Sequence, residues 1–242
     1  EVVIAGLISQ CVAGTRSYPP DQKVPPSMPG PHSTSITVVN DTTLASARTL
    51  LAEKLNPVAL NFASATDPGG GFLSGARAQE EYLTRSSGLY ACLRGNPMYE
   101  FHRKQDNPLY SSYAVYSPNV PVFRDDDGSL LNEPYTVGII TSAAVYASRV
   151  DARMKTEIGP AMWDRILKVL YIGLHHGHDA IVLGAWGCGA FGNDGHAIAL
   201  LFHKALTVNF KGAYKKVVFA IVDWSPEHTF IGPFHEAFSH RP

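Results

Sequence analysis

The chain has 242 residues and a formal net charge of −1, with 45% hydrophobic and 17% charged residues. This length allows one large α/β domain with a substantial core, and we expect residues 1–242 to form a single domain. The near-neutral charge excludes a globally basic nucleic-acid surface, and no apolar run reaches the roughly 18–20 residues of a membrane span. We therefore expect no direct nucleic-acid partner and no membrane partner.

The first part of the chain combines an apolar stretch with a proline-rich one. Residues 1–13 are apolar but lack the basic start and cleavage site of a signal peptide, so we expect a helix or strand. Residues 17–35 contain six prolines, which predicts an extended connector or surface loop. The cysteines match neither a disulfide framework nor a zinc site, which favours a reducing compartment; they are Cys11, Cys92 and Cys188.

Apolar strands and amphipathic helices then alternate. Strands are predicted over 36–40, 58–64, 113–117, 120–125, 135–147, 180–186 and 217–223. Helices are predicted from Asp41 to Leu55, over 78–93 and 161–176, and after Asn193 or Asp194. Near-continuous apolar strands separated by such helices indicate a largely parallel or mixed sheet that is covered on both faces.

Two glycine-rich loops follow predicted strands. Gly69, Gly70 and Gly71 come after strand 58–64, and GCGAFGN (187–193) comes after strand 180–186. Without side chains, a backbone can approach a ligand closely and point several N–H groups at one anion. Ligands in such sheets bind at the carboxyl ends of the strands, so the loops predict a diphosphate site, although tight turns alone would also use glycine.

The second loop also allows other interpretations. Gly187, Gly189 and Gly192 match G-x-G-x-x-G, a pattern of dinucleotide-dependent oxidoreductases, but the acidic residue expected about 20 positions later is missing. Cys188 could be a nucleophile, yet no histidine partner is evident in the sequence. Both alternatives are weaker than phosphate binding.

Two adjacent glutamates follow the first loop at the start of a predicted helix. Glu80 and Glu81 could simply favour the helix dipole. A buried glutamate close to bound phosphate, however, can have a raised pKa and act as the general acid that glycoside cleavage requires. Neighbouring helical residues point about 100° apart, so the two carboxylates can serve different roles.

GGG at 69–71, followed after seven residues by QEE at 79–81, resembles the signature of poly(ADP-ribose) glycohydrolases of the microbial type, a catalytic branch of the macrodomain fold. The resemblance covers most of the chain in order, through VNDTTLASA (39–47), LNFASATDPGGGF (60–72), QEEYLTRSSGLY (79–90), YSPNVPVFRDDDG (116–128), IITSAA (139–144) and GAWGCGAFGN (184–193). It implies a macrodomain-like three-layer α/β/α sandwich with a mixed, largely parallel central sheet.

The resemblance also implies roles for individual residues. Glu81 would protonate the ribose–ribose glycosidic oxygen and then activate water against an oxocarbenium-like ribose, while Glu80 would hold ribose hydroxyls. Phe191 would pack against a ribose. The predicted substrate-binding residues are Asp41, Ser64, Gly69, Gly70, Gly71, Gln79, Gly187, Cys188, Gly189, Ala190, Phe191 and Gly192, together with Phe230, which is chosen for its place after the last predicted strand.

By the same resemblance, the substrate is poly(ADP-ribose) or ADP-ribosylated protein, cleaved from chain ends to release ADP-ribose. Neither a metal nor a cofactor is implied. We expect a monomer that acts in the cytoplasm or nucleus and reverses ADP-ribosylation, as in the DNA damage response. The alternative function is a non-catalytic macrodomain that only binds ADP-ribose.

The sequence says least about which residues contact the adenine. Asp41 could accept the adenine amino group or cap a helix. Trp224 and Phe230 follow the last predicted strand, where either could stack on a base or pack in the core.

Three polar stretches favour ordinary structure over a binding site. The histidines between 175 and 178 suit a helix C-terminus better than a metal site. HRKQ (102–105) predicts a solvated surface loop, with attraction of a polyanion as the alternative. DDDG (125–128) predicts a turn, with calcium binding as the alternative.

Overall fold

A seven-stranded mixed sheet forms the centre of the computed structural model, which describes residues 2–239. The strands are β1 (Arg16–Tyr18), β2 (Ser35–Val39), β3 (Pro57–Phe62), β4 (Ala114–Arg124), β5 (Leu130–Ser142), β6 (Ala180–Leu183) and β7 (Lys216–Ala220). Their order in the sheet is β1-β4-β5-β3-β6-β7-β2. Neighbours from β5 to β2 pair in parallel, whereas β4 is antiparallel to both β1 and β5.

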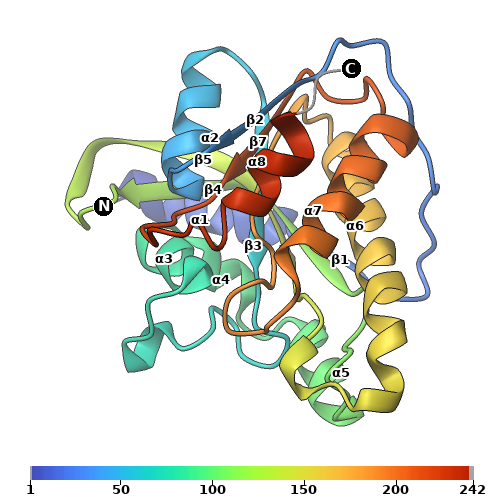
Figure 1. The fold of residues 1–242 in the computed structure, drawn as a ribbon. Helices are drawn as coiled ribbons and strands as arrows, with labels where there is room; N and C mark the ends of the chain where they lie inside the picture. Colours follow the sequence, from blue (N-terminus) through green and yellow to red (C-terminus); the bar gives the residue numbers. More distant parts are fainter. Residues whose placement is uncertain (1, 240–242) are drawn as a thin grey trace.

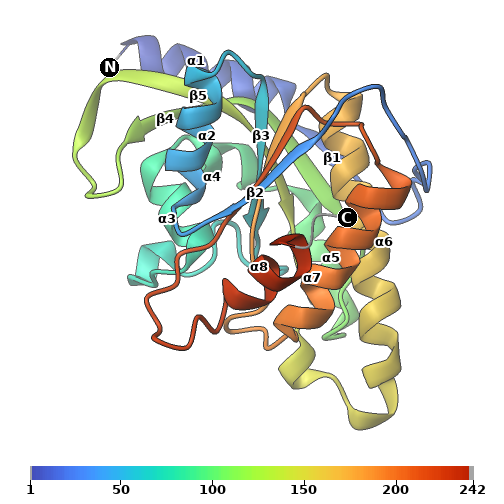
Figure 2. The same cartoon turned by 45° about the horizontal axis from the view of Figure 1, so that its top comes forward.

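Helices cover both faces of this sheet (Figure 1). One layer contains α1 (Val2–Gly14), α2 (Thr43–Ala52), α3 (Gln79–Ser86), α4 (Leu89–Leu93) and α5 (Pro97–Gln105). The other contains α6 (Ile158–His175), α7 (Gly195–Lys204) and α8 (Gly232–Ser239). Short helical turns are η1 (Phe72–Ser74), η2 (Ala147–Arg149), η3 (Ala152–Glu157) and η4 (Ala205–Asn209). Figure 2 shows the same separation from a second direction, so the predicted three-layer architecture is confirmed.

Alternate strand residues divide the core between the two layers, because successive side chains of a strand point to opposite faces. In β3, Leu60 packs in the cluster with Ile166 of α6, whereas Ala59 packs in the cluster with Leu50 of α2 and Leu83 of α3. These side chains are fully buried, which stabilises the fold by about 1.5–3 kcal/mol for each Leu or Ile. This packing holds the helix N-termini beside the carboxyl ends of the strands.

Several predicted boundaries move in the structure. The strands predicted over 113–117 and 120–125 are one strand, β4, which continues through an irregularity between Ser117 and Val120. The helix predicted over 78–93 is interrupted, because Ser87 takes an extended conformation and forms a bridge with Val122. The strand predicted over 135–147 begins earlier, at the hairpin with β4, and ends at Ser142.

The prediction of a surface loop at 102–105 is wrong. These residues end α5, in which Asn96 caps the N-terminus and Pro97 occupies the first turn. His102 is 1% exposed and lies against the residues that follow β3. Neither β1 nor α8 was predicted.

The predictions for the first part of the chain largely agree with the structure. Residues 1–13 were expected to form a helix or strand, and α1 occupies their described part. Residues 19–34 of the connector predicted over 17–35 contain no helix or strand, whereas Ser17 and Tyr18 belong to β1 and Ser35 begins β2. Backbone N–H groups of Gly30 and His32 donate to the carbonyls of Lys211 and Gly212, which fastens the connector away from the cavity described below.

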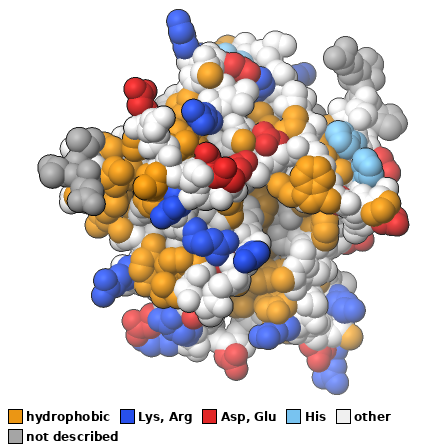
Figure 3. Space-filling model, turned by 90° about the vertical axis from the view of Figure 1, so that its left-hand side faces the viewer, with side chains coloured by type: hydrophobic (Ala, Val, Ile, Leu, Met, Phe, Trp, Pro, Cys, Tyr) orange, Lys and Arg blue, Asp and Glu red, His pale blue; other side chains and the backbone are white. Residues whose placement is uncertain are grey.

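None of the helices in residues 2–239 has the length and continuous apolar character that a membrane span needs. The face toward which the β4–β5 hairpin points mixes acidic, basic and apolar side chains (Figure 3). The predicted DDDG turn lies in this hairpin, where the Asp125 N–H donates to the carbonyl of Ser129.

Candidate active site

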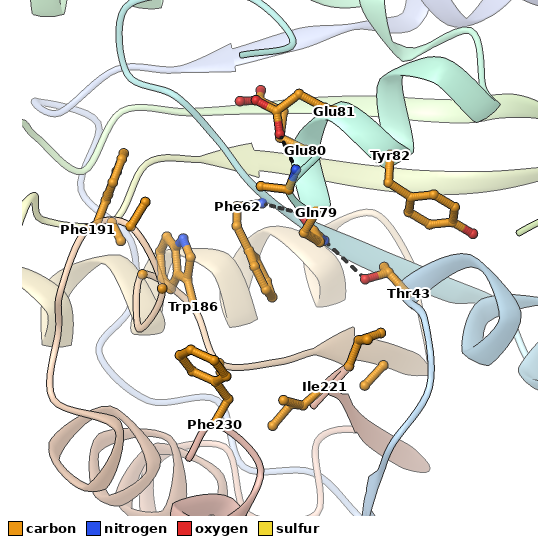
Figure 4. Close-up of a pocket in the computed structure, with 18 of the residues that line it drawn as sticks. Thr43, Phe62, Gln79, Glu80, Glu81, Tyr82, Trp186, Phe191, Ile221 and Phe230 are labelled. Carbon is orange, nitrogen blue, oxygen red and sulfur yellow. Dashed lines mark hydrogen bonds between the residues drawn. The ribbon is translucent and has the colours of Figure 1, made fainter. Parts of the chain in front are cut away.

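A cavity of about 610 Å³ lies at the carboxyl ends of β3, β6 and β7, and this volume is typical of small-molecule sites. Its walls are the residues after β3, the start of α3, the loop after β6 and the segment after β7. In Figure 4, Glu80 and Glu81 lie at one end, Phe230 and Ile221 at the other, and Phe62 between them. Segments far apart in the sequence therefore meet at the predicted edge of the sheet.

Glu80 is 3% exposed, and both of its carboxylate oxygens accept hydrogen bonds. Asn61 Nδ2 donates to Oε1 at 3.2 Å and the Ser64 N–H donates to Oε2 at 2.6 Å. Burial raises the pKa of Glu80 to about 8; these hydrogen bonds oppose the rise, and the nearby charge of Glu81 adds to it. Glu80 therefore holds a proton at neutral pH.

Glu81 is fixed by backbone groups on both sides. Its Oε1 accepts from the Gly71 N–H and its Oε2 from the Ala78 N–H, each at 2.9 Å. Glu81 is the third residue of α3, so the second bond is the carboxylate half of a capping box. The helix start and the glycine turn together hold this carboxylate toward the cavity.

The glycine triplet supports the carboxylates from behind and does not line the cavity. Gly70 has φ +60°, and a β-carbon there would overlap with Glu81 Oε1 and lie 3.0 Å from Glu80 Oε2. The Gly70 N–H donates to the carbonyl of Asp67, and the Gly71 N–H is used by Glu81. Only glycine allows the backbone to approach the two carboxylates this closely.

Gln79 lines the cavity, but its amide is engaged by the scaffold. Its Nε2 donates to the carbonyl of Leu60 at 2.8 Å and to Thr43 Oγ1 at 3.1 Å, while its Oε1 accepts from the Phe62 N–H at 2.9 Å. These bonds, visible in part in Figure 4, fasten the start of α3 to the end of β3 and to α2.

The loop after β6 is shaped by Asn193. Asn193 Nδ2 donates to the carbonyls of Val145, at 2.7 Å, and Gly187, at 3.0 Å. Gly187 has φ +77°, and a β-carbon there would lie 2.6 Å from Asn193 Nδ2. The loop therefore curls tightly and leads into α7. The N-cap of α7 is Asp194, which is one of the two residues predicted to start this helix.

The outward side of this loop offers three consecutive backbone donors. Gly189, Ala190 and Phe191 line the cavity, and within residues 2–239 their N–H groups donate to no protein acceptor. The Phe191 ring stacks on Tyr146, with centroids 4.5 Å apart. Such a row of free N–H groups suits an anion.

Two other predicted residues of this loop lie outside the lining. Gly192 has φ +70° and turns the chain toward α7. The Cys188 thiol contacts the carbonyl of Trp186, and burial raises its pKa to about 12. A thiol held this strongly in its neutral form is a poor nucleophile.

The far end of the cavity is formed by the segment after β7. Phe230 lines the cavity, whereas Trp224 is 83% exposed and does not. Asp223 organises this segment: Oδ2 accepts from the N–H groups of Phe230 and Ile231, and Oδ1 accepts from Ser225. Burial would raise the pKa of Asp223, but these hydrogen bonds outweigh it and hold the pKa well below its usual range.

Asp41 lines the cavity near the start of α2, but it is not the helix cap. Thr42 is the N-cap and accepts from the Ala45 N–H, while Asp41 accepts from the Thr42 N–H and the Ser46 hydroxyl. Thr42 Oγ1 also donates to Asp126 of the β4–β5 hairpin, at 2.9 Å. Asp126 additionally accepts from Tyr82, so the predicted DDDG turn braces α2 and α3.

Sequence reasoning missed lining residues such as Phe62, Tyr82 and Trp186, and it missed two buried residues that position the site, Asn61 and Asp223. Asn61 is 0% exposed on an otherwise apolar strand, and it orients Glu80. A polar residue inside an apolar run was the available signal, because buried polar groups need partners. Asp223 is likewise a polar residue at the end of an apolar run, the strand predicted over 217–223.

Within residues 2–239, no group of three or more His, Cys, Asp or Glu side chains is arranged to hold a metal ion. The histidines at the end of α6 bond to aromatic residues instead. His176 Nε2 pairs with Tyr18 OH at 2.7 Å, and His178 Nε2 pairs with Tyr116 OH at 2.8 Å.

Comparison with known proteins points to one family. The family model described as microbial-type PARG, catalytic domain, matches residues 1–125. Poly(ADP-ribose) glycohydrolase from Thermomonospora curvata, solved with the inhibitor ADP-HPD, is 46% identical with a TM-score of 0.89, covering 97% of this chain and 89% of that chain. The enzyme from Deinococcus radiodurans, solved with ADP-ribose, is 38% identical with a TM-score of 0.91, covering 95% and 96%. No curated protein matches the chain.

Proposed function

This chain belongs to the microbial-type poly(ADP-ribose) glycohydrolases, and from that membership we propose that Glu81 and Glu80 cleave the ribose–ribose bond in the cavity described above. The observation that carries the proposal is the buried pair of carboxyl groups at one end of the cavity. Hydrolysis of a glycosidic bond needs a proton donor to the leaving oxygen and a base for water, and carboxyl groups supply both.

The substrate would lie along the cavity with its adenine far from the carboxylates. Phe230 offers a ring for stacking, and Asp41 offers an acceptor for the adenine amino group. The free N–H groups of Gly189, Ala190 and Phe191 would bind the diphosphate. This orientation brings the terminal ribose to Glu80 and Glu81.

In the proposed reaction, the proton of Glu81 passes to the glycosidic oxygen as the bond to the anomeric carbon breaks. The bonding electrons leave with the oxygen, and the ribose becomes oxocarbenium-like. Glu80 holds ribose hydroxyls beside the reacting carbon. The Glu81 carboxylate then removes a proton from water, which attacks the same carbon, and this returns the acid to its starting form.

Burial raises the pKa of Glu80 to about 8, so its carboxyl group is neutral near pH 7. A neutral carboxyl group can donate one hydrogen bond to a ribose hydroxyl and accept others, which suits a positioning role for Glu80.

We further propose that the enzyme acts at chain ends. One terminal ADP-ribose unit would occupy the cavity, with the scissile bond at the Glu81 end. Products that contain only monomeric ADP-ribose at early times support this mode, and early oligomers contradict it.

The decisive experiment compares Glu81→Gln with wild type on poly(ADP-ribose) attached to a carrier protein. Release of ADP-ribose should fall by about 10²–10⁴-fold, the usual contribution of a general acid. Affinity for ADP-ribose, measured by calorimetry, should stay within a few-fold of wild type, because the lost interaction belongs to the transition state.

Glu133→Gln provides the matched control, since Glu133 is exposed on β5 and away from the cavity. Normal release by this variant and lost release by Glu81→Gln would support the assignment. Substantial release by Glu81→Gln would exclude Glu81 as the acid. Wild-type protein that binds ADP-ribose but releases none would favour the alternative function, a binding macrodomain.

A further inference from the structure

Two buried cysteines lie in contact on the face of the sheet opposite α6. Cys11 of α1 and Cys92 of α4 are 81 positions apart in the sequence, and their Sγ atoms are 3.1 Å apart. Cys11 is 1% exposed and Cys92 is 6% exposed. Neither contributes to the cavity, and neither is part of the proposed reaction.

The surroundings of the two sulfurs are chemically unequal. Cys11 Sγ lies 3.2 Å from the carbonyl of Ile8 and 3.1 Å from Cys92 Sγ, so its one proton can be donated to either acceptor. The hydroxyls of Thr15 and Ser117 lie beside Cys92. Donation from Cys11, with help from these hydroxyls, lowers the pKa of Cys92, so Cys92 is the first of the pair to ionise.

We propose that Cys11 and Cys92 are an oxidation site at which a peroxide forms a disulfide between α1 and α4. Two thiols on different elements, already in van der Waals contact and away from any other cysteine, need little movement to become bonded. The third cysteine, Cys188, lies in the loop after β6 on the other side of the sheet.

The step balances with hydrogen peroxide as the oxidant. The Cys92 thiolate attacks one peroxide oxygen, the O–O bond breaks, and the departing hydroxide takes a proton to form water. Cys92 is then a sulfenic acid. Cys11 Sγ attacks Cys92 Sγ, the S–O bond breaks, and the hydroxyl leaves with the Cys11 proton as a second water. Two thiols have been oxidised and one peroxide has been reduced.

The bond would act on a segment that contacts the candidate site. Tyr90 of α4 packs on Phe72, which lies directly after the glycine triplet, with ring centroids 4.9 Å apart. The disulfide would tie α1 to this segment and close a long loop of chain, which stabilises the folded state by restricting the unfolded one.

The test begins with reduced wild-type protein, which is treated with hydrogen peroxide, blocked with iodoacetamide and digested with trypsin without reduction. Cleavage after Arg16, Arg85 and Arg94 should yield residues 1–16 joined to residues 86–94 by a disulfide. Free thiols should fall from three to one. The melting temperature should rise by about 5–10 °C and return on addition of dithiothreitol.

Cys188→Ser is the matched control, because it keeps the pair, and its free thiols should fall from two to none. Cys11→Ser should lose both the linked peptide and the rise in melting temperature. Three intact thiols after peroxide treatment would overturn the proposal. A disulfide that includes Cys188, a link between two molecules, or thiol loss without the linked peptide would overturn it as well.

Discussion

Gly70 shows how one residue determines the position of both candidate carboxylates. The space that a β-carbon would occupy at Gly70 is filled by Glu81 Oε1, with Glu80 Oε2 at 3.0 Å. The left-handed backbone at this position also turns the chain so that the Gly71 N–H reaches Glu81. Glycine is required here by contact and by conformation together.

Gly70→Ala should therefore displace the Glu81 carboxylate. We expect release of ADP-ribose to fall by about 100-fold or more, since a misplacement of roughly 1 Å in a catalytic group has that effect. Steady-state rates on carrier-bound poly(ADP-ribose) measure this change.

Gly95→Ala is the control that separates two effects of Gly70→Ala: the steric clash with Glu81, and the free-energy cost of alanine in a left-handed backbone conformation. Gly95 has φ +76°, but a β-carbon there meets nothing within 4 Å. Both variants should lose about 1–2 kcal/mol of stability from the strained backbone, but only Gly70→Ala should lose activity. Equal activity in the two variants would contradict the claim that a β-carbon at Gly70 displaces the Glu81 carboxylate.

Glu80 also makes stability depend on pH in a direction that can be tested. Its pKa is about 8 in the folded state, against 4.5 for a glutamate side chain in water, so the folded state binds the proton more tightly. The stability contributed by that proton is complete below pH 4.5 and is lost as the pH rises to about 8.

Glu80→Gln should remove this dependence. Relative to wild type, its melting temperature should rise by several degrees between about pH 5 and about pH 8, and then change no further. Loss of a hydrogen bond to Ser64 or Asn61 lowers stability by an amount that is constant with pH, so it does not affect the comparison. A difference between the two proteins that stays constant over this range would contradict the raised pKa.

At the scale of elements, helix α5 supports the segment after β3 from outside the cavity. His102 Nδ1 pairs with the carbonyl of Ala65 at 3.2 Å, and Arg103 donates to the carbonyl of Thr66. Burial lowers the pKa of His102 to about 4, so the imidazole is neutral and can donate from Nδ1 while Nε2 accepts from Ser111. Sequence reasoning did not find this helix, because its buried face is made partly of His102 and Tyr99, whose polar groups do not mark a core position.

The segment after β7 depends in the same way on a single buried acceptor. Asp223→Asn should release Phe230, because an amide cannot accept all of the N–H and O–H donors that now reach the carboxylate. We expect affinity for ADP-ribose to fall by about tenfold, near the contribution of one hydrogen bond to a charged group. Calorimetry measures the change.

Asp106→Asn is the control for this prediction. Asp106 is exposed at the end of α5 with φ 42°, a conformation that asparagine accepts readily. Its affinity should match wild type. An Asp223→Asn protein with unchanged affinity would mean that Phe230 does not bind the base.

The sequence predicted whole elements better than their ends. Strands such as 58–64 and the helix over 161–176 were found because their apolar patterns are long and regular. The ends of β5 and the break between α3 and α4 depend on contacts across the sheet, such as the bridge from Ser87 to Val122, which local patterns do not contain.

At the scale of the whole molecule, the cavity is assembled by the order of the strands. Glu80, Phe191 and Phe230 follow β3, β6 and β7, which are neighbours in the sheet although they are distant in the sequence. The two glycine loops at strand ends predicted one shared site, and the family resemblance implied that Glu80 and Phe191 belong to it. Neither could show that the glycine triplet lies behind the carboxylates, because that depends on which way each N–H points.

The bonds around Glu81 have one more consequence. Both oxygens are held by backbone N–H groups of the protein itself, so the side chain loses its rotational freedom when the chain folds. A flexible side chain ordered during binding would lose about 0.5–1.5 kcal/mol of affinity through conformational entropy. The carboxylate of Glu81 is therefore already immobile when substrate binds. The free energy gained from binding the adenine and diphosphate is not needed to order this side chain, so it can lower the reaction barrier.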